Sequence, residues 1–239
     1  MKRIMLNQKS GMNYSDIETY VSNLKTYQNK FQIYPSSIYI SKFVESGYNT
    51  GIQNIAESSK GNQTGEITAS QAKSCGVNSV IIGHSERRLN QKEDAEVLIN
   101  KFNEAIENNL SIIYCVGESL VDYRLKNTEN FIYNELKEVF DKITIPENLD
   151  LCVAYEPIWA IGSGMTPTNY EIADVSKVIR KYLDENKLKA DILYGGSVNE
   201  KNIDELLKID EVDGFLIGGA SNDYNKVIKI CESAMNSTK

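Results

Sequence analysis

The sequence predicts a (β/α)8 barrel, because short apolar runs alternate with segments of helical periodicity along the chain. The runs are continuously apolar, which is typical of parallel strands that are buried on both faces and joined by helical crossovers. An open doubly wound sheet would show the same alternation, but eight strand–helix units in 239 residues match the usual barrel of about 250 residues. The expected strands are Arg3–Asn7, Phe31–Tyr34, Gly51–Gln53, Ser79–Gly83, Ser111–Cys115, Leu151–Tyr155, Asp191–Tyr194 and Gly214–Ile217.

Helix start signals lie between the expected strands. Ser15-x-x-Glu18, Thr68-x-x-Gln71 and Thr168-x-x-Glu171 each place a hydroxyl where it can cap orphan backbone N–H groups. Gly76 is well placed to end the helix that begins after Thr68. The helix after Thr168 has an apolar stripe at helical spacing, formed by Ile172, Val175, Val178, Ile179 and Tyr182.

The composition indicates an acidic protein with a single domain over residues 1–239, because no linker or low-complexity tract divides the chain. With 26 Lys and Arg against 33 Asp and Glu, the net charge of −7 disfavours general binding to nucleic acid or to an anionic membrane. No apolar run approaches the roughly 20 residues of a membrane span, and the first residues form too short an apolar run for a signal peptide. We therefore expect a cytoplasmic protein.

Cysteine and histidine are too sparse to predict a metal site. The four cysteines lie far apart without a C-x-x-C pair, and the chain has one histidine. Reduced thiols in a reducing compartment fit this pattern better than a disulfide framework does. We therefore expect no zinc site and no metal site built on paired histidines.

Polar residues follow the expected strands, at the ends where a parallel barrel collects its chemistry. A helix beginning at Ser85 would aim its positive end at the ring of His84 and disfavour the imidazolium. A neutral imidazole suits polarisation of a carbonyl, although a lone histidine is otherwise often structural. Asn7 ends the first strand and Lys9 follows it near the rim, where Lys9 can supply the cation that an anion or an enediolate requires. The alternative for Lys9 is an ordinary solvated lysine.

Glu156 ends another expected strand, and Pro157 biases it to an extended conformation. A salt-bridge partner is one interpretation of such a glutamate. The residues that follow, Ile158 to Gly164, form an apolar loop with two glycines at its far end. This composition suits a lid that closes over a ligand and excludes water. A carboxylate under such a lid can act as a general base.

Paired glycines end the last two expected strands, in Tyr194-Gly195-Gly196-Ser197 and in Ile217-Gly218-Gly219-Ala220-Ser221. One such pair of glycines most simply marks a turn. Two pairs on neighbouring strands indicate more, because the loops after barrel strands seven and eight are the usual phosphate site. The expected ligand is therefore a phosphate ester.

Seven segments, in order, resemble the triosephosphate isomerase family over almost the whole chain. They are Asn7-x-Lys9, TGEIT at 64–68, IIGHSERR at 81–88, YCVGE at 114–118, AYEPIWAIGSG at 154–164, YGGSV at 194–198 and VDGFLIGGAS at 212–221. The resemblance implies a TIM barrel that interconverts dihydroxyacetone phosphate and D-glyceraldehyde 3-phosphate in glycolysis and gluconeogenesis. It implies Glu156 as the base that moves a proton between C1 and C2, and His84 as the neutral electrophile.

The resemblance implies no metal, nucleotide or redox cofactor. It also implies roles for further residues. Asn7, Gln8, Lys9, Gly162, Ser197, Gly218 and Gly219 would hold the substrate and its phosphate, with Ser85, Glu86 and Cys115 around the catalytic groups. The lid would comprise Pro157, Ile158, Trp159, Ala160, Ile161, Gly162, Ser163, Gly164 and Met165. The family is usually a homodimer, in which Thr64 would reach the neighbouring site with Glu66 and Arg87 supporting the contact. Gln8, Met165 and Asn62-Gln63 depart from the residues common in the family.

Two alternative functions share these features. A paralogous isomerase of another small ketose phosphate, such as a tetrulose phosphate, would carry the same catalytic positions. A catalytically silent binding barrel would keep the fold, but both Glu156 and His84 are present. A metal-dependent sugar-phosphate epimerase is disfavoured, because its ligands would include more than one histidine.

Overall fold

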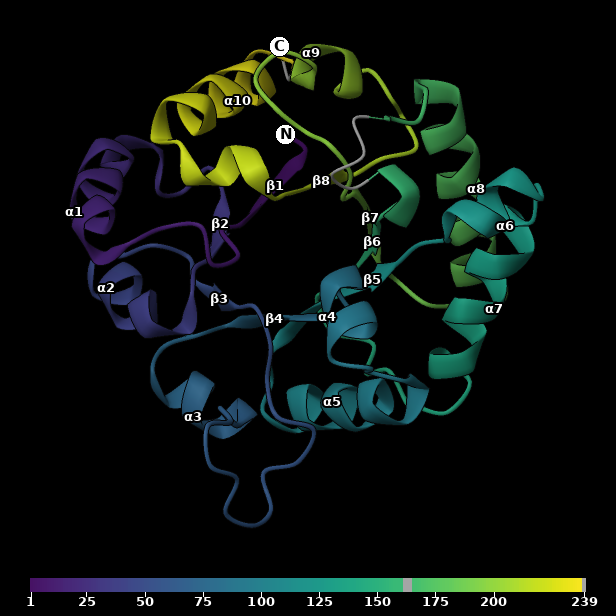
Figure 1. The fold of residues 1–239 in the computed structure, drawn as a ribbon, viewed down its shortest axis with the longest axis horizontal. Coiled ribbons are helices and arrows are strands. Elements are labelled where there is room, and N and C mark those ends of the chain that lie inside the picture. Colours follow the sequence, from purple (N-terminus) through teal and green to yellow (C-terminus); the bar gives the residue numbers. More distant parts are fainter. Residues whose placement is uncertain (161–164, 238–239) are drawn as a thin grey trace.

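Eight parallel strands form a barrel surrounded by helices in the computed structural model (Figure 1). The structure describes residues 1–160 and 165–237. The strand order is β2-β1-β8-β7-β6-β5-β4-β3, and one parallel bridge, between Ile33 and Thr50, joins β2 to β3. The (β/α)8 prediction is confirmed, and each strand lies within one residue of its expected bounds. The strands are β1 (Arg3–Asn7), β2 (Gln32–Tyr34), β3 (Gly51–Ile52), β4 (Ser79–Ile82), β5 (Ser111–Val116), β6 (Leu151–Tyr155), β7 (Asp191–Tyr194) and β8 (Gly214–Ile217).

The helices begin where capping side chains satisfy the first backbone N–H groups. Thr68 and Thr168 form the predicted capping boxes with Gln71 and Glu171. The predicted start at Ser15 is wrong, because the N-cap is Asn13, whose N–H donates to the Asp16 carboxylate. The α-helices are α1 (Tyr14–Asn23), α2 (Ile40–Glu45), α3 (Ala69–Ser74), α4 (Ser85–Asn90), α5 (Ala95–Glu107), α6 (Leu120–Arg124), α7 (Thr128–Phe140), α8 (Asn169–Glu185), α9 (Ile203–Leu206) and α10 (Tyr224–Asn236). The 3-10 turns are η1 (Lys25–Tyr27), η2 (Ser37–Tyr39), η3 (Ile158–Ala160) and η4 (Gly219–Asn222).

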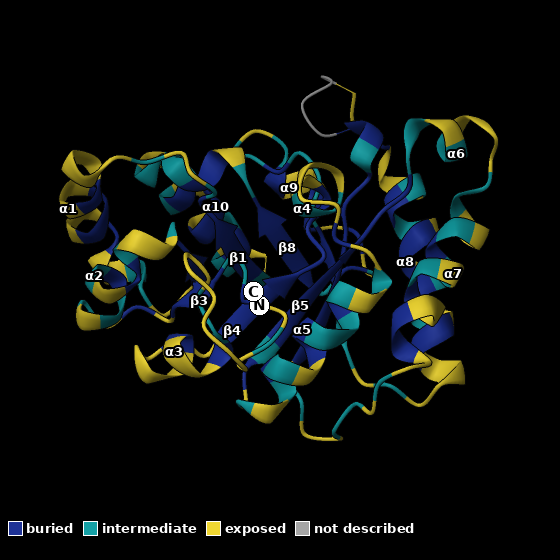
Figure 2. Ribbon diagram, turned by 60° about the horizontal axis from the view of Figure 1, so that its bottom comes forward, coloured by how far each residue is buried: buried dark blue, intermediate teal, exposed yellow. Residues whose placement is uncertain are grey.

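The core has two layers, as expected for strands buried on both faces. The larger layer lies between the strands and the helices, and the smaller one fills the barrel with side chains that include Met5, Ile81, Ile113, Leu193 and Leu216. Figure 2 shows the buried strands at the centre and the exposed residues on the outer surfaces of the helices. In the described part of the chain, no helix has the length and apolar character needed to cross a membrane.

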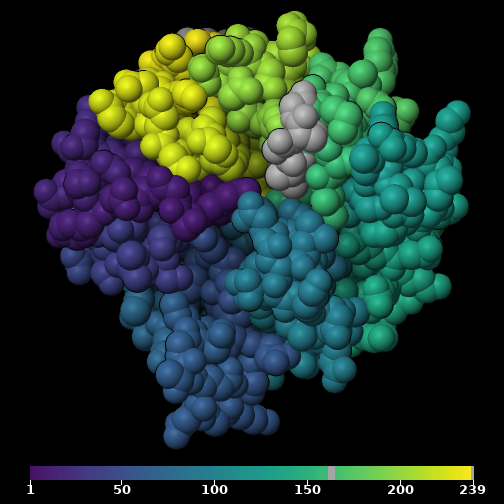
Figure 3. Space-filling view, viewed as in Figure 1, coloured from purple at the N-terminus to yellow at the C-terminus, as the bar shows by residue number. Residues whose placement is uncertain are grey.

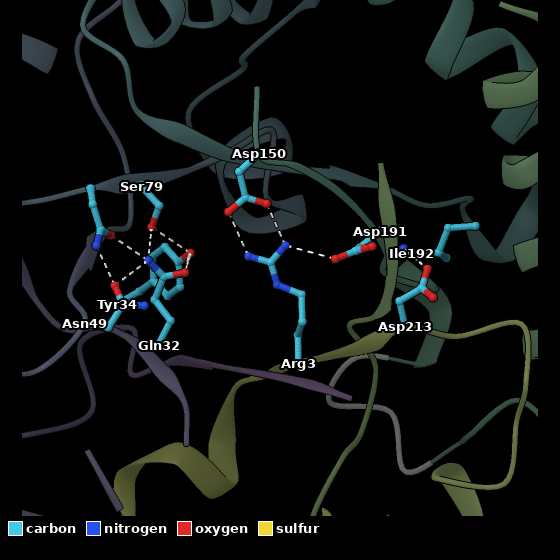
Figure 4. Close-up of polar contacts among 10 residues, drawn as sticks. Arg3, Gln32, Tyr34, Asn49, Ser79, Asp150, Asp191, Ile192 and Asp213 are labelled. Atoms are coloured by element: carbon cyan, nitrogen blue, oxygen red, sulfur yellow. Dashed lines mark hydrogen bonds and ion pairs between the residues drawn. The ribbon is translucent and has the colours of Figure 1, made fainter. Parts of the chain in front are cut away.

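Polar contacts close the N-terminal end of the barrel, opposite the end that bears the predicted site (Figure 4). The Arg3 guanidinium donates to both carboxylate oxygens of Asp150, at 2.7 and 2.9 Å, and to Asp191 at 3.0 Å. The Arg3 hydrogen bond lowers the pKa of the Asp150 carboxyl. Gln32 donates to Asn78 and to Ser79, each at 2.7 Å. Polar residues at this end of a barrel serve stability rather than chemistry.

Candidate active site

A cavity of about 470 Å³ opens at the C-terminal ends of the strands. Segments far apart in the sequence meet at the centre of this face of the molecule (Figure 3). The cavity is lined by Asn7, Lys9, His84, Glu86, Glu156, Gly195, Gly196, Ser197, Val198, Asn199, Leu216, Gly218, Gly219 and Ala220. The structure therefore brings together the predicted base, electrophile, cation and glycine loops.

Glu156 and His84 form a buried pair in this cavity, with exposed fractions of 2% and 6%. Glu156 Oε1 lies 3.2 Å from His84 Nε2, while Glu156 Oε2 accepts the Ser85 backbone N–H at 3.0 Å. His84 Nδ1 accepts the Glu86 backbone N–H at 3.2 Å. Because Nδ1 accepts, the neutral imidazole carries its proton on Nε2, the atom that faces Glu156.

Two glycines make the space that Glu156 occupies. A Cβ on Gly117 would lie 1.8 Å from the Glu156 carbonyl oxygen, and a Cβ on Gly195 would lie 2.9 Å from Glu156 Cγ. Real Cβ atoms do not approach that closely, so any larger residue at either position would displace the glutamate. Sequence reasoning missed Gly117, although its position directly after a strand was a usable signal.

Lys9 adopts a strained backbone conformation, with a φ of +51°, that a network of amides supports. Its N–H donates to the Asn7 side chain at 3.2 Å, and the Gln53 amide donates to the Lys9 carbonyl at 2.8 Å. The ammonium lies 2.5 Å from Glu86 Oε1. Partial burial opposes ionisation of Glu86, but the hydrogen bond and charge of Lys9 lower the pKa of that carboxyl. A cation is thereby fixed beside the His84–Glu156 pair.

The loops predicted to hold the phosphate also line the cavity. Ser197 follows β7, and η4 starts at Gly219 directly after β8. The Ser221 hydroxyl donates to the Asn7 carbonyl at 2.9 Å, which ties η4 to β1. The backbone of Gly218 lies against the Lys9 side chain, since an added Cβ would be 3.3 Å from Lys9 Cε. Gly162, the remaining predicted phosphate contact, lies outside the described residues.

Three residues predicted to hold the substrate or to surround the catalytic groups do not line the cavity: Gln8, Ser85 and Cys115. Gln8 is 1% exposed, and its amide nitrogen lies 3.0 Å from the Met12 sulfur. Cys115 packs inside the barrel, where burial and then the charge of Glu156 raise the pKa of its thiol. A protonated, buried thiol fits a packing role for Cys115 rather than a chemical one.

The predicted lid is described only in part. Pro157 and η3 lie at the mouth of the barrel, where Ile158 is half-buried and Trp159 and Ala160 are buried. Met165, which follows residues 161–164 in the sequence, is exposed. Ile161, Gly162, Ser163 and Gly164 lie outside the described residues.

A second cavity, of about 520 Å³, adjoins the first and shares Asn7, Lys9, His84 and Glu86 with it. Its other walls come from η2, from α4 and from the chain between β3 and α3, which projects from the body of the molecule (Figure 1). Thr64 and Glu66 are exposed in this projecting segment. Arg87 lines the cavity and donates to Glu93 at 2.5 Å.

The fold and the first cavity define a (β/α)8 barrel whose candidate active site lies at the C-terminal ends of its strands. A family model described as triosephosphate isomerase matches residues 2–234. The triosephosphate isomerase of Ruthia magnifica subsp. Calyptogena magnifica is 37% identical over 221 residues, which cover 89% of each chain. That of Dictyostelium discoideum is 42% identical over 188 residues, covering 77% of this chain and 73% of the relative. That of Malacoplasma penetrans is 32% identical over 249 residues, covering 98% and 99%. The chain belongs to the triosephosphate isomerase family.

Proposed function

We propose that this protein interconverts dihydroxyacetone phosphate and D-glyceraldehyde 3-phosphate in the cytoplasm, as a step of glycolysis and gluconeogenesis. One observation carries the proposal: the Glu156 carboxylate lies 3.2 Å from His84 Nε2 in a cavity that Lys9 also lines. A base, a neutral hydrogen-bond donor and a cation are the groups that proton transfer beside a carbonyl requires.

Glu156 takes a proton from C1 of dihydroxyacetone phosphate and returns it to C2. The O1 hydroxyl gives up its proton and O2 gains one, exchanged through His84 Nε2, so that the aldehyde forms at C1 and the hydroxyl at C2. His84 donates its Nε2–H to the carbonyl oxygen, where negative charge develops in the enediolate. Lys9 stabilises the same charge, and Asn7 supports the backbone that presents Lys9. When the Glu156 carboxylate takes the substrate proton, it must give up the hydrogen bond that it accepts from the Ser85 N–H.

The substrate phosphate binds at the loops after β7 and β8. Ser197, Gly218 and Gly219 border the cavity there, and glycines let backbone N–H groups approach a phosphate closely. We assign Gly162 to the same phosphate from the lid. Because the chain carries a net charge of −7, this local site and Lys9 must supply the attraction for the anionic substrate.

We also propose that the protein acts as a homodimer of single-domain subunits. Residues 59–66 are exposed and project from the body, whereas the second cavity lies beside Lys9. Thr64 of one subunit would enter that cavity of the other, next to Glu66 and Arg87. Ile38 in η2 and Leu89 in α4 are 79% and 55% exposed, and both elements border the cavity. Such apolar exposure is typical of an interaction surface.

A coupled assay of triose phosphate turnover without added metal tests the activity, with a tetrulose phosphate in parallel and Glu156→Gln as the control. Turnover of the triose phosphate that the variant loses supports the proposal. Activity on the tetrulose phosphate alone would show the paralogous isomerase. The absence of activity on both substrates would overturn the proposal in favour of a binding barrel.

A further inference from the structure

Trp159 carries a stacked partner that the mechanism above does not use. The ring of Tyr123, in α6, lies 4.1 Å from the Trp159 ring between centroids, with an interplanar angle of 22°. Trp159 is 7% exposed and comes three residues after Glu156, within η3. Pro157 lies between them and restricts the backbone there.

A buried carboxylate fixes the edge of the same indole. Trp159 Nε1 donates to Glu118 Oε1 at 2.8 Å, and the Tyr155 hydroxyl donates to the same oxygen at 3.1 Å. Glu118 is fully buried, and its Oε2 has no hydrogen-bond partner among the described residues. The Trp159 ring is therefore held by Glu118 at its edge and by Tyr123 on its face.

Tyr123 also binds the chain beyond Met165. Its hydroxyl donates to Glu171 Oε1 at 2.7 Å. The other oxygen of Glu171 accepts the N–H of Thr168 at 2.7 Å and its hydroxyl at 2.8 Å, in the capping box of α8. Tyr123 thus links η3, which precedes residues 161–164, to the first turn of the helix that follows them.

The linked rings border open space rather than solid core. Tyr123, Trp159 and Glu171 line a cavity of about 590 Å³ outside the barrel. On the side that faces this cavity, the indole is not surrounded by closely packed neighbours. The contacts with Tyr123 therefore help to fix its position there. This arrangement differs from that of a core aromatic, which neighbours surround on every side.

We propose that Tyr123 is a positioning residue for the isomerisation: its ring holds the Trp159 turn, and with it Glu156, while its hydroxyl couples that turn to the start of α8. The proposal rests on the proposed function, because it requires that Glu156 act on the substrate. Tyr123 itself does not line the cavity of about 470 Å³ that contains Glu156 and His84.

Three variants separate the parts of this contact. Tyr123→Leu removes both ring and hydroxyl, and Tyr123→Phe removes only the hydroxyl. Tyr133→Phe is the matched control, since the Tyr133 hydroxyl donates to Glu185 at the other end of α8, at 3.0 Å. Trp159 is the only tryptophan, so quenching of its fluorescence by acrylamide reports on this site alone.

We expect Tyr123→Leu to lower kcat about 10-fold with little change in KM, and to raise the quenching constant of Trp159 about 2-fold. Tyr123→Phe should lower kcat about 2- to 3-fold and leave the quenching close to wild type, and Tyr133→Phe should change neither. If Tyr123→Leu does not fold, Tyr123→Phe still tests the proposal, because it removes only the hydroxyl.

If the wild type is active and the Tyr123 variants keep its kcat, the role of Tyr123 is overturned, whereas the proposed function stands. An equal loss of kcat in Tyr133→Phe would likewise overturn it, since the effect would then be general to α8. A wild type without triose phosphate turnover would overturn the proposed function together with this inference.

Discussion

Glu156 and His84 face each other across 3.2 Å at the mouth of the barrel, and the second oxygen of Glu156 accepts the N–H of Ser85. The backbone next to the histidine thus holds the carboxylate, and the Glu86 N–H fixes the orientation of the ring. Both groups of the proposed proton transfer are positioned by the same short segment, His84 to Glu86.

Shortening the base should be costly because proton transfer depends on distance. Glu156→Asp keeps the charge but withdraws the carboxylate by one methylene, and we expect kcat to fall by about 100-fold or more with little change in KM. The coupled assay measures this, with the exposed Glu138→Asp as the control. Near-normal turnover in Glu156→Asp would contradict its role as the base.

Removal of the site cation should weaken the stabilisation of the enediolate. We expect Lys9→Met to lower kcat/KM by about 100- to 1000-fold, the loss typical of one group that stabilises an oxyanion. Lys181→Met, which removes an exposed lysine of α8, should leave kcat/KM unchanged. Equal kinetics in the two variants would show that Lys9 is an ordinary surface lysine.

Stability should depend on pH through Glu135, whose side chain is 11% exposed and lies 3.3 Å from Arg88. Burial raises the pKa of Glu135 from 4.5 to about 7, although the Arg88 charge opposes the shift. The folded chain therefore holds this proton more tightly than the unfolded chain. The resulting stability is fully present below about pH 4.5 and is lost as the pH rises through about 7.

Glu135→Gln should therefore gain stability relative to wild type between pH 5 and 8, by about 2 to 3 kcal/mol. Urea unfolding at several pH values measures the difference, and Glu138→Gln on the exposed side of α7 is the control. If the free energies of unfolding of wild type and Glu135→Gln depend on pH in the same way, the raised pKa of Glu135 is refuted.

Charge at the proposed subunit interface should separate the subunits. Ile38→Asp places a carboxylate on the exposed apolar surface of η2, and we expect light scattering to show a monomer with reduced activity. Leu125→Asp, at a residue that is 71% exposed and directly follows α6, should remain dimeric. If the wild-type protein becomes monomeric on dilution and stays fully active, the proposed entry of Thr64 into the neighbouring subunit's cavity is contradicted.

The strands were predictable because burial on both faces leaves a continuous apolar run in the sequence. The same reasoning drew attention to His84 and Glu156, which directly follow expected strands, and to Lys9, which lies two residues beyond the end of one. The start of α1 was not resolved in the same way, because Asn13 with Asp16 and Ser15 with Glu18 are equally good capping patterns.

Relations between distant segments could not be derived from local pattern. The clearance that Gly117 and Gly195 provide for Glu156 depends on how three strands meet. The contact of Tyr123 with Trp159 joins residues of two separate elements, and neither position shows it alone. Gln8 likewise gave no sign that its side chain packs on Met12.

The most direct test follows the transferred proton itself. Conversion of dihydroxyacetone phosphate in D2O, observed by NMR, should give D-glyceraldehyde 3-phosphate with deuterium at C2, because the proton held on Glu156 exchanges with solvent before its return. Glu156→Gln should abolish both turnover and incorporation, while circular dichroism shows that it is folded. Turnover with deuterium incorporation in folded Glu156→Gln would contradict the account.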